Sequence, residues 1–206
     1  MSRSPHDVPW PTRFEPSGFA CSYSCELLPT LPSGAVRQFG IPGKLHHRVG
    51  AVVSVKPARG DAWVGSFETG DGGFSRVLGT PSPRHPLVIV RGLAYAVCVE
   101  DTSESEMLMH DTQRTWSYPD RGLVVLADSV HFVAYGVGRL AWRSRRVSAD
   151  GLEFTACEGG RIEGNAWDPA TRHAGVPQAG TVRTRHAELP RAEMATRTRD
   201  ARRHRG

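Results

Sequence analysis

Two pairs of histidine and carboxylate residues are the side chains in this sequence best suited to acid–base chemistry. His110 is followed directly by Asp111, and His131 lies three residues after Asp128. An imidazole held beside a carboxylate can serve as a general base. Polar residues at the ends of strands more often face water without any catalytic role. These four residues are therefore the candidate catalytic residues, and a solvent-facing role is the alternative.

Two cysteines and two histidines near the N-terminus have the side-chain types of a zinc site. They are Cys21, Cys25, His46 and His47. Zinc takes thiolate and imidazole ligands in a tetrahedron, at regular spacings along the chain. Adjacent histidines seldom both reach one ion, and the gap between Cys25 and His46 is longer than in a zinc finger. The spacing therefore favours unrelated loop residues, and we expect neither a metal nor a cofactor.

A glycine motif at residues 136–141 resembles a dinucleotide-binding fingerprint. Gly136-Val-Gly138-Arg-Leu-Ala141 has the form G-x-G-x-x-A and follows a strand-like segment. The fingerprint requires a helix next, whose N-terminal amides bind the pyrophosphate. The residues that follow carry no apolar helical stripe. The motif therefore predicts a hairpin turn between residues 130–135 and 139–143.

Short strand-like segments must position these candidate residues. Each is rich in Val, Leu, Phe, Tyr or Trp and is bounded by Gly, Asp, Pro or Ser. They are residues 50–56, 61–68, 87–91, 93–99, 106–110, 123–127, 130–135, 139–143, 152–157 and 161–167. None shows a sustained helical period. The pattern predicts an all-β fold of short antiparallel strands in repeated hairpin or blade-like units, as a partial propeller or a sandwich.

The two ends of the chain differ from this central region. Residues 1–47 are Pro-rich and predict an irregular arm with a short strand near 36–39. Residues 48–172 form the expected β-repeat domain. Residues 173–206 have almost no large apolar side chain, and eight arginines stand against three acids in 181–206. Such a segment cannot bury enough surface to offset its ordering entropy, so we expect a disordered tail.

Two dipeptides that recur within the central region, Gly-Leu and Ala-Trp, suggest an internal repeat. Gly-Leu opens strand-like segments at residues 92, 122 and 151, at spacings of 30 and 29 residues. Ala-Trp recurs with Trp63, Trp142 and Trp167. Repeats of this period are typical of stacked antiparallel sheets, although short strands between glycine turns can also match by chance. The recurrence favours buried tryptophans in equivalent strands over a surface on which a ligand stacks.

Two stretches carry a resemblance to a known group of proteins. Residues 139–154, Arg-Leu-Ala-Trp-Arg-Ser-Arg-Arg-Val-Ser-Ala-Asp-Gly-Leu-Glu-Phe, are followed by Gly-Arg-Ile-Glu-Gly-Asn-Ala-Trp-Asp-Pro at 160–169. Over about residues 60–170 the chain resembles uncharacterised bacterial proteins with β-propeller-like repeats. The resemblance implies a β fold and no activity. Four-stranded blades need roughly 40 residues each, so we expect an open or partial β assembly, which a second copy of the chain could complete.

These observations lead to one leading functional hypothesis and two alternatives. The leading hypothesis is a β-repeat module that binds a protein or small ligand through its loops. One alternative is a hydrolase with acid–base residues on strand-end loops, and the other is contact of the Arg-rich tail with anions or nucleic acid. No apolar run approaches the roughly 20 residues of a membrane span, and no secretory signal is recognisable. We expect reduced thiols and a cytoplasmic location.

Overall fold

The fold is all-β, as the sequence predicts. The computed structural model describes residues 13–44, 48–149, 151–158 and 161–166. These residues form fifteen strands in four sheets, together with the single 3-10 turns η1 (Thr102–Glu104) and η2 (Pro119–Arg121). No helix in this part of the chain is long and apolar enough to cross a membrane. The predicted tail at residues 173–206 lies outside the described residues.

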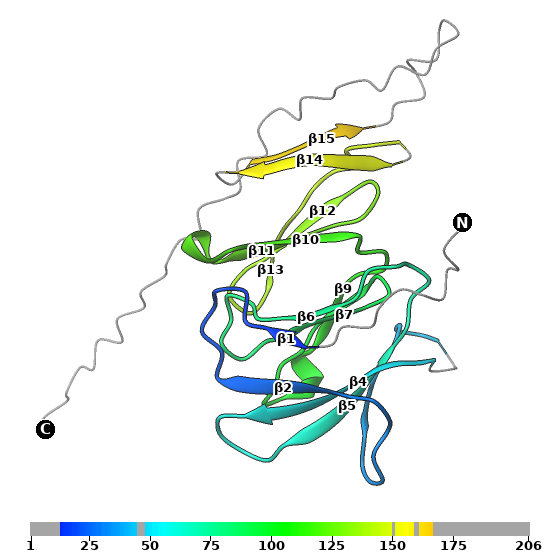
Figure 1. Ribbon diagram of the computed structural model, residues 1–206, viewed down its shortest axis with the longest axis vertical. Helices are drawn as coiled ribbons and strands as arrows, with labels where there is room; N and C mark the ends of the chain where they lie inside the picture. The colour runs from blue at the N-terminus through cyan, green and yellow to red at the C-terminus, as the bar shows by residue number, and fades with distance from the viewer. Residues whose placement is uncertain (1–12, 45–47, 150, 159–160, 167–206) are drawn as a thin grey trace, which may run out of the picture.

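The sheets lie one above another in chain order (Figure 1). The first sheet has the order β2 (Tyr23–Leu28), β4 (Val49–Pro57), β5 (Trp63–Glu68) and β3 (Arg37–Phe39). The second has the order β1 (Phe14–Glu15), β6 (Arg76–Leu78), β7 (Leu87–Val90), β8 (Leu93–Ala96) and β9 (Glu106–Met109). The third contains β10 (Arg114–Tyr118), β11 (Leu123–Ala127), β12 (Phe132–Tyr135) and β13 (Leu140–Arg143). A hairpin of β14 (Leu152–Glu158) and β15 (Arg161–Ala166) follows.

Neighbouring strands are antiparallel except at two edges. β1 runs parallel to β6, and β3 runs parallel to β5. The other pairs are antiparallel because short turns connect most of them directly. Within the described part of the chain, the sheets do not close into a ring and form no propeller. The second and third sheets therefore lie in the interior of an open stack.

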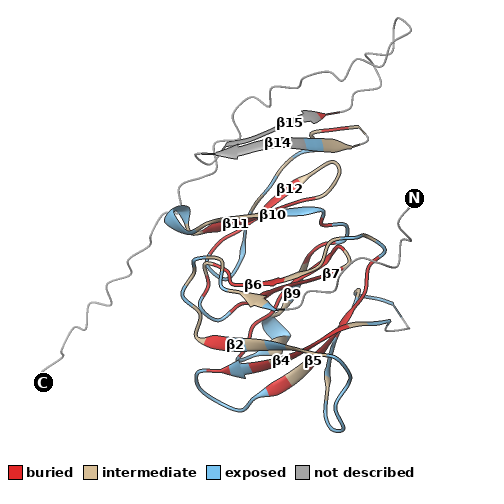
Figure 2. Cartoon of the chain, viewed as in Figure 1, coloured by how far each residue is buried: buried red, intermediate tan, exposed pale blue. Residues whose placement is uncertain are grey.

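Apolar clusters between the sheets hold the stack together. Inward-facing residues of β4, Ala51, Val53 and Val55, pack against the second sheet in the first cluster. A second cluster joins the second sheet to the third, and a third cluster covers the far face of the third sheet. Every residue of β7, β8, β11 and β12 is buried (Figure 2). These four strands are almost continuously apolar, as expected of strands covered on both faces.

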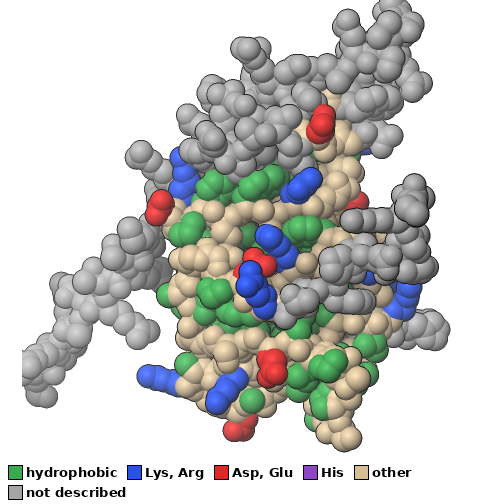
Figure 3. All heavy atoms as spheres, viewed as in Figure 1, with side chains coloured by type: hydrophobic (Ala, Val, Ile, Leu, Met, Phe, Trp, Pro, Cys, Tyr) green, Lys and Arg blue, Asp and Glu red, His purple; other side chains and the backbone are tan. Residues whose placement is uncertain are grey.

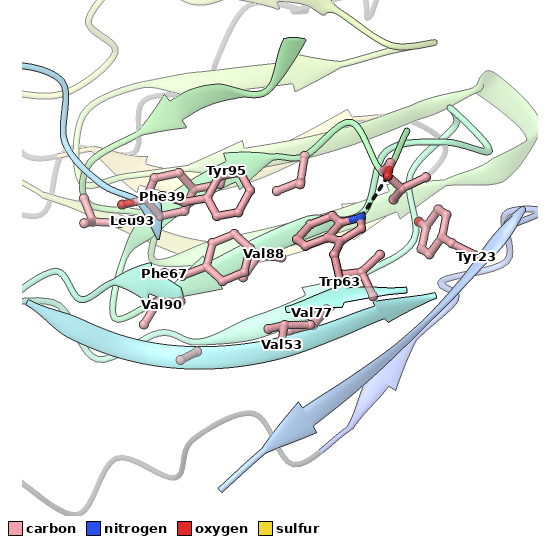
Figure 4. Packing of buried hydrophobic residues seen from close by; sticks show 14 residues of the cluster. Tyr23, Phe39, Val53, Trp63, Phe67, Val77, Val88, Val90, Leu93 and Tyr95 are labelled. Atoms are coloured by element: carbon pink, nitrogen blue, oxygen red, sulfur yellow. Dashed lines mark hydrogen bonds between the residues drawn. The ribbon is translucent and has the colours of Figure 1, made fainter. Parts of the chain in front are cut away.

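Aromatic side chains anchor the first sheet to the second (Figure 4). The indole Nε1 of Trp63 donates a hydrogen bond to the backbone oxygen of Val99, at 2.9 Å. Phe39 stacks on Phe67 with ring centroids 4.5 Å apart. Because β3 brings Phe39 beside β5, the three rings fill the space between the sheets. The expectation that Trp63 is buried is confirmed.

The other two tryptophans of the recurring Ala-Trp dipeptide differ from Trp63. Trp142 is partly exposed, because it lies on β13 at the open edge of the third sheet. It packs against the third apolar cluster, so it is mostly covered, as expected, although less deeply than Trp63. Trp167 lies outside the described residues. The glycines of the recurring Gly-Leu dipeptide each precede a strand and have φ angles of 93°, 60° and 114° at positions 92, 122 and 151. A true repeat stays a prediction.

The N-terminal region contains more structure than the sequence suggests. The short strand expected near residues 36–39 is present as β3, but β2 is a six-residue strand paired with β4 along its whole length. Residues 13–44 are therefore not an irregular arm. The prolines at 16, 29 and 32 lie outside β2 and do not interrupt its hydrogen bonds. Strands β6 and β10 are likewise additional to those expected.

The glycine motif at residues 136–141 forms a hairpin turn, as predicted. It connects β12 to β13, which are antiparallel, and Gly136 N donates to the backbone oxygen of Arg139 at 3.0 Å. Gly138 has a φ angle of 71°, in the left-handed region that favours glycine. No helix follows in residues 140–149, so this turn does not provide the helical N-terminal amides that bind a pyrophosphate.

Candidate functional site

The ends of the strand stack are the places where this fold can expose functional side chains. The inner two sheets are covered on both faces, so their connecting loops and edge strands carry the accessible polar groups. On the face shown in Figure 3, charged side chains occur singly or in small groups rather than as one patch.

Both histidine and carboxylate pairs lie at the same end of the stack. His110 and Asp111 follow β9, whereas Asp128 and His131 belong to the connection between β11 and β12. Two antiparallel strands, β10 and β11, separate the two connections, and an even number of strands returns the chain to the same end. We call this region the polar end: residues 69–73, 91–92, 110–113 and 128–131.

Gln113 connects the two pairs. Its backbone N–H donates to the oxygen of Ala127 at 2.7 Å, directly before Asp128. Its side-chain Nε2 donates to Oδ2 of Asp111 at 3.2 Å. The carboxylate of Asp111 and the loop that carries His131 are therefore held by one residue.

Asp128 fixes both its own turn and the imidazole of His131. Its Oδ1 accepts hydrogen bonds from the backbone N–H groups of Val130, at 2.7 Å, and of His131. Its Oδ2 lies 3.4 Å from Nδ1 of His131, whose side chain is 35% exposed. This is the arrangement in which a carboxylate orients an imidazole, leaving Nε2 as the nitrogen for proton exchange.

His110 and Asp111 are exposed and rest against a strained turn. Arg91 and Gly92 form the two-residue turn between β7 and β8, with φ angles of 45° and 93°. The left-handed conformation costs Arg91 about 1–2 kcal/mol. Its Nε donates to the oxygen of Gly72 at 3.1 Å, which holds the glycine-rich loop against the turn. Strained residues of this kind often mark functional loops.

The described part of the candidate zinc site consists of Cys21 and Cys25, which are free thiols. Burial, followed by the charge of Cys21, raises the pKa of Cys25 to about 12. Zinc binds the thiolate, so a metal at this position would have to displace the proton of Cys25. His46 and His47 lie outside the described residues. Within residues 13–44 and 48–149, no three His, Cys, Asp or Glu side chains gather as metal ligands would.

A buried serine and histidine pair at the opposite end is additional to the sequence-based candidates. Ser82 Oγ and His85 Nδ1 are 2.6 Å apart, and the two residues are 4% and 5% exposed. Burial, and then the charge of Arg84, lowers the pKa of His85. The hydroxyl of Thr80 donates to the His85 backbone oxygen at 2.6 Å. The bonds are local to one turn, so we assign this pair a bracing role.

A buried glutamate, Glu68, was also not among the candidate residues predicted from the sequence. Glu68 is 1% exposed and forms an ion pair with Lys44, at 2.9 Å. Its other oxygen accepts a hydrogen bond from the backbone N–H of Ile41, at 2.8 Å. The pair attaches the loop after β3 to the end of β5, beside the polar end. An acid directly after the apolar Phe67 was the only signal in the sequence.

Comparison of the chain with protein-family models, with curated proteins and with solved structures found no match. The resemblance to bacterial proteins with β-propeller-like repeats therefore stays a prediction. The functional interpretation depends on the geometry of the polar end alone.

Proposed function

We propose that the protein is a non-enzymatic interaction module that binds a protein or small ligand through the polar end. The observation that carries this proposal is the convergence of both histidine and carboxylate pairs at one end, joined by Gln113. The inner sheets are covered on both faces, so on them a ligand must use an end or an edge. Binding residues are commonly found on loops that a rigid scaffold positions.

The polar end suits a ligand with both hydrogen-bond donors and acceptors. Its carboxylates accept hydrogen bonds, its imidazoles can donate or accept them, and the guanidinium of Arg91 donates them. Internal hydrogen bonds hold Asp128 and Arg91 in place before any ligand arrives. Loops that are already ordered lose less entropy on binding, which favours affinity.

A hydrolase is the second candidate, and the contact between Asp128 and His131 favours it. At 3.4 Å from the carboxylate, the imidazole is oriented as in a general base. The other alternative, contact of the Arg-rich tail with nucleic acid, concerns residues outside the described part of the chain and stays a prediction. We also propose the cytoplasm as the location, on the sequence argument given above.

The test is ligand capture with two matched triple variants. One replaces His110, Asp111 and His131 by alanine at the polar end. The control replaces Lys56, Arg59 and Asp61, which are exposed around the β4–β5 turn at the opposite end. We expect wild type and control to retain the same protein or metabolite, and the polar-end variant to lose it. Equal retention by all three proteins would refute the proposal.

The same positions distinguish a hydrolase from an interaction module. Hydrolysis of a panel of chromogenic esters and phosphate esters is measured as a function of pH. Turnover that is lost in His131→Ala and retained in the control would show that the protein is a hydrolase and not a non-enzymatic interaction module. If the protein is an interaction module without activity, every variant hydrolyses the substrates no faster than buffer alone.

A further inference from the structure

The outer edge of the third sheet is a second exposed surface. Its C-terminal end lies next to the polar end, because Val147 N donates to the oxygen of Val130 at 2.8 Å. β13 pairs with β12 on one side and has no strand on the other within the described chain. The turn before it and its first residue expose apolar side chains, with Val137 67% and Leu140 40% accessible. We call residues 137–146 the β13 edge. Unpaired backbone groups on such an edge can bind another extended chain.

The backbone of Arg143 faces outward along this edge. Ser144 N donates to the oxygen of Phe132 at 2.9 Å, so residue 144 points its backbone groups at β12. In an antiparallel ladder these groups alternate in direction. Arg143, paired with Val133, therefore directs its N–H and C=O away from β12.

The β13 edge is strongly cationic. It contains four arginines and no acid: Arg139, Arg143, Arg145 and Arg146. Among the described residues, no carboxylate lies within salt-bridge distance of any of them. The edge therefore keeps a net positive charge.

Two of these arginines are held by the protein and two are not. Arg143 donates to the backbone oxygen of Leu108 at 2.8 Å, which joins β13 to β9 of the second sheet. Arg146 binds the backbone oxygens of Ser148 and Ala149. Arg139 and Arg145 are exposed at the two ends of the strand. Their charges are available to a partner lying along the edge.

The charge decides which partner this edge accepts. A second copy pairing antiparallel through β13 would place arginines opposite arginines, and like charges across strands are destabilising. An acidic partner strand would instead bring carboxylates against both free guanidiniums. We propose that the β13 edge binds an extended acidic segment of a partner protein by β-strand addition. This inference is independent of the ligand at the polar end.

The test uses a fluorescein-labelled peptide of alternating Glu and Val, measured by fluorescence polarisation with the full chain. We expect saturable binding that weakens with salt. The double variant Arg139→Glu, Arg145→Glu should weaken it at least about fivefold, from the two exposed ion pairs it removes. Arg13→Glu, Arg59→Glu is the matched control, with the same change of charge at exposed arginines elsewhere. It should leave affinity within about twofold.

Two further probes separate strand addition from simple charge attraction. A peptide of the same sequence, N-methylated at alternate residues, keeps its charge but cannot form the backbone ladder. We expect it to lose binding; equal affinity would overturn the proposal. Single-stranded DNA of equal charge should compete poorly, and tighter DNA binding would overturn the choice of a peptide. An edge that binds no peptide at low salt would also refute it.

Discussion

Trp63→Phe tests how the first sheet is attached to the rest of the stack. The side chain is 8% exposed, and its Nε1 donates to the oxygen of Val99, itself buried. Phenylalanine keeps an aromatic ring but leaves that oxygen unpaired, which costs about 1–3 kcal/mol. The contact with Arg37, whose guanidinium lies 4.8 Å from the indole, weakens by about 0.5 kcal/mol. Together with the smaller ring, we expect a loss of about 2–4 kcal/mol.

The free energy of unfolding would be measured by urea titration with circular dichroism. Trp142→Phe is the matched control, because it is the same change at a half-buried edge position. We expect it to cost less than about 1 kcal/mol. If the two variants were equally stable, the hydrogen bond to Val99 would not anchor the first sheet, and our description of the core would be wrong.

Three further substitutions, at His85, Gly70 and Gly122, test the stability of the fold. The lowered pKa of His85 means that the folded state favours the neutral ring, so its contribution is complete above about pH 6.5 and is lost as the pH falls below that value. His85→Gln should flatten this part of the curve of melting temperature against pH; parallel curves would contradict it. Gly70→Ala would place a Cβ 2.3 Å from the oxygen of Arg91 and should cost about 3 kcal/mol. Gly122→Ala meets no atom within 4 Å at a φ of 60°, so urea titration should show a loss of only about 1 kcal/mol.

The strands of the core were largely predictable because their apolar runs are short and bounded by turn residues. β7, β8, β11 and β12 lie within predicted segments. β2 was not predicted, because its sequence Tyr-Ser-Cys-Glu-Leu-Leu lies between prolines that suggested an irregular chain. Its stability comes from pairing with β4, which is distant in the sequence. Local patterns do not contain that information.

The residues of the candidate site could be predicted individually, but their common location in the fold could not. The common end of His110 and His131 follows from two intervening antiparallel strands, and β10 was the strand absent from the predicted set. With β10 included, strand parity alone would have brought the two pairs together. The bracing role of Ser82 and His85 depends on their burial, with His85 beside Tyr135 of the third sheet, which no local pattern shows.

If the polar end is the binding surface, a bound ligand must slow hydrogen exchange there. Hydrogen exchange measured by mass spectrometry, with and without the ligand that the wild-type protein retains, tests it most directly. We expect slower exchange at residues 69–73, 91–92, 110–113 and 128–131, and no change around the β4–β5 turn. Protection elsewhere, with these four segments unchanged, would contradict the claim.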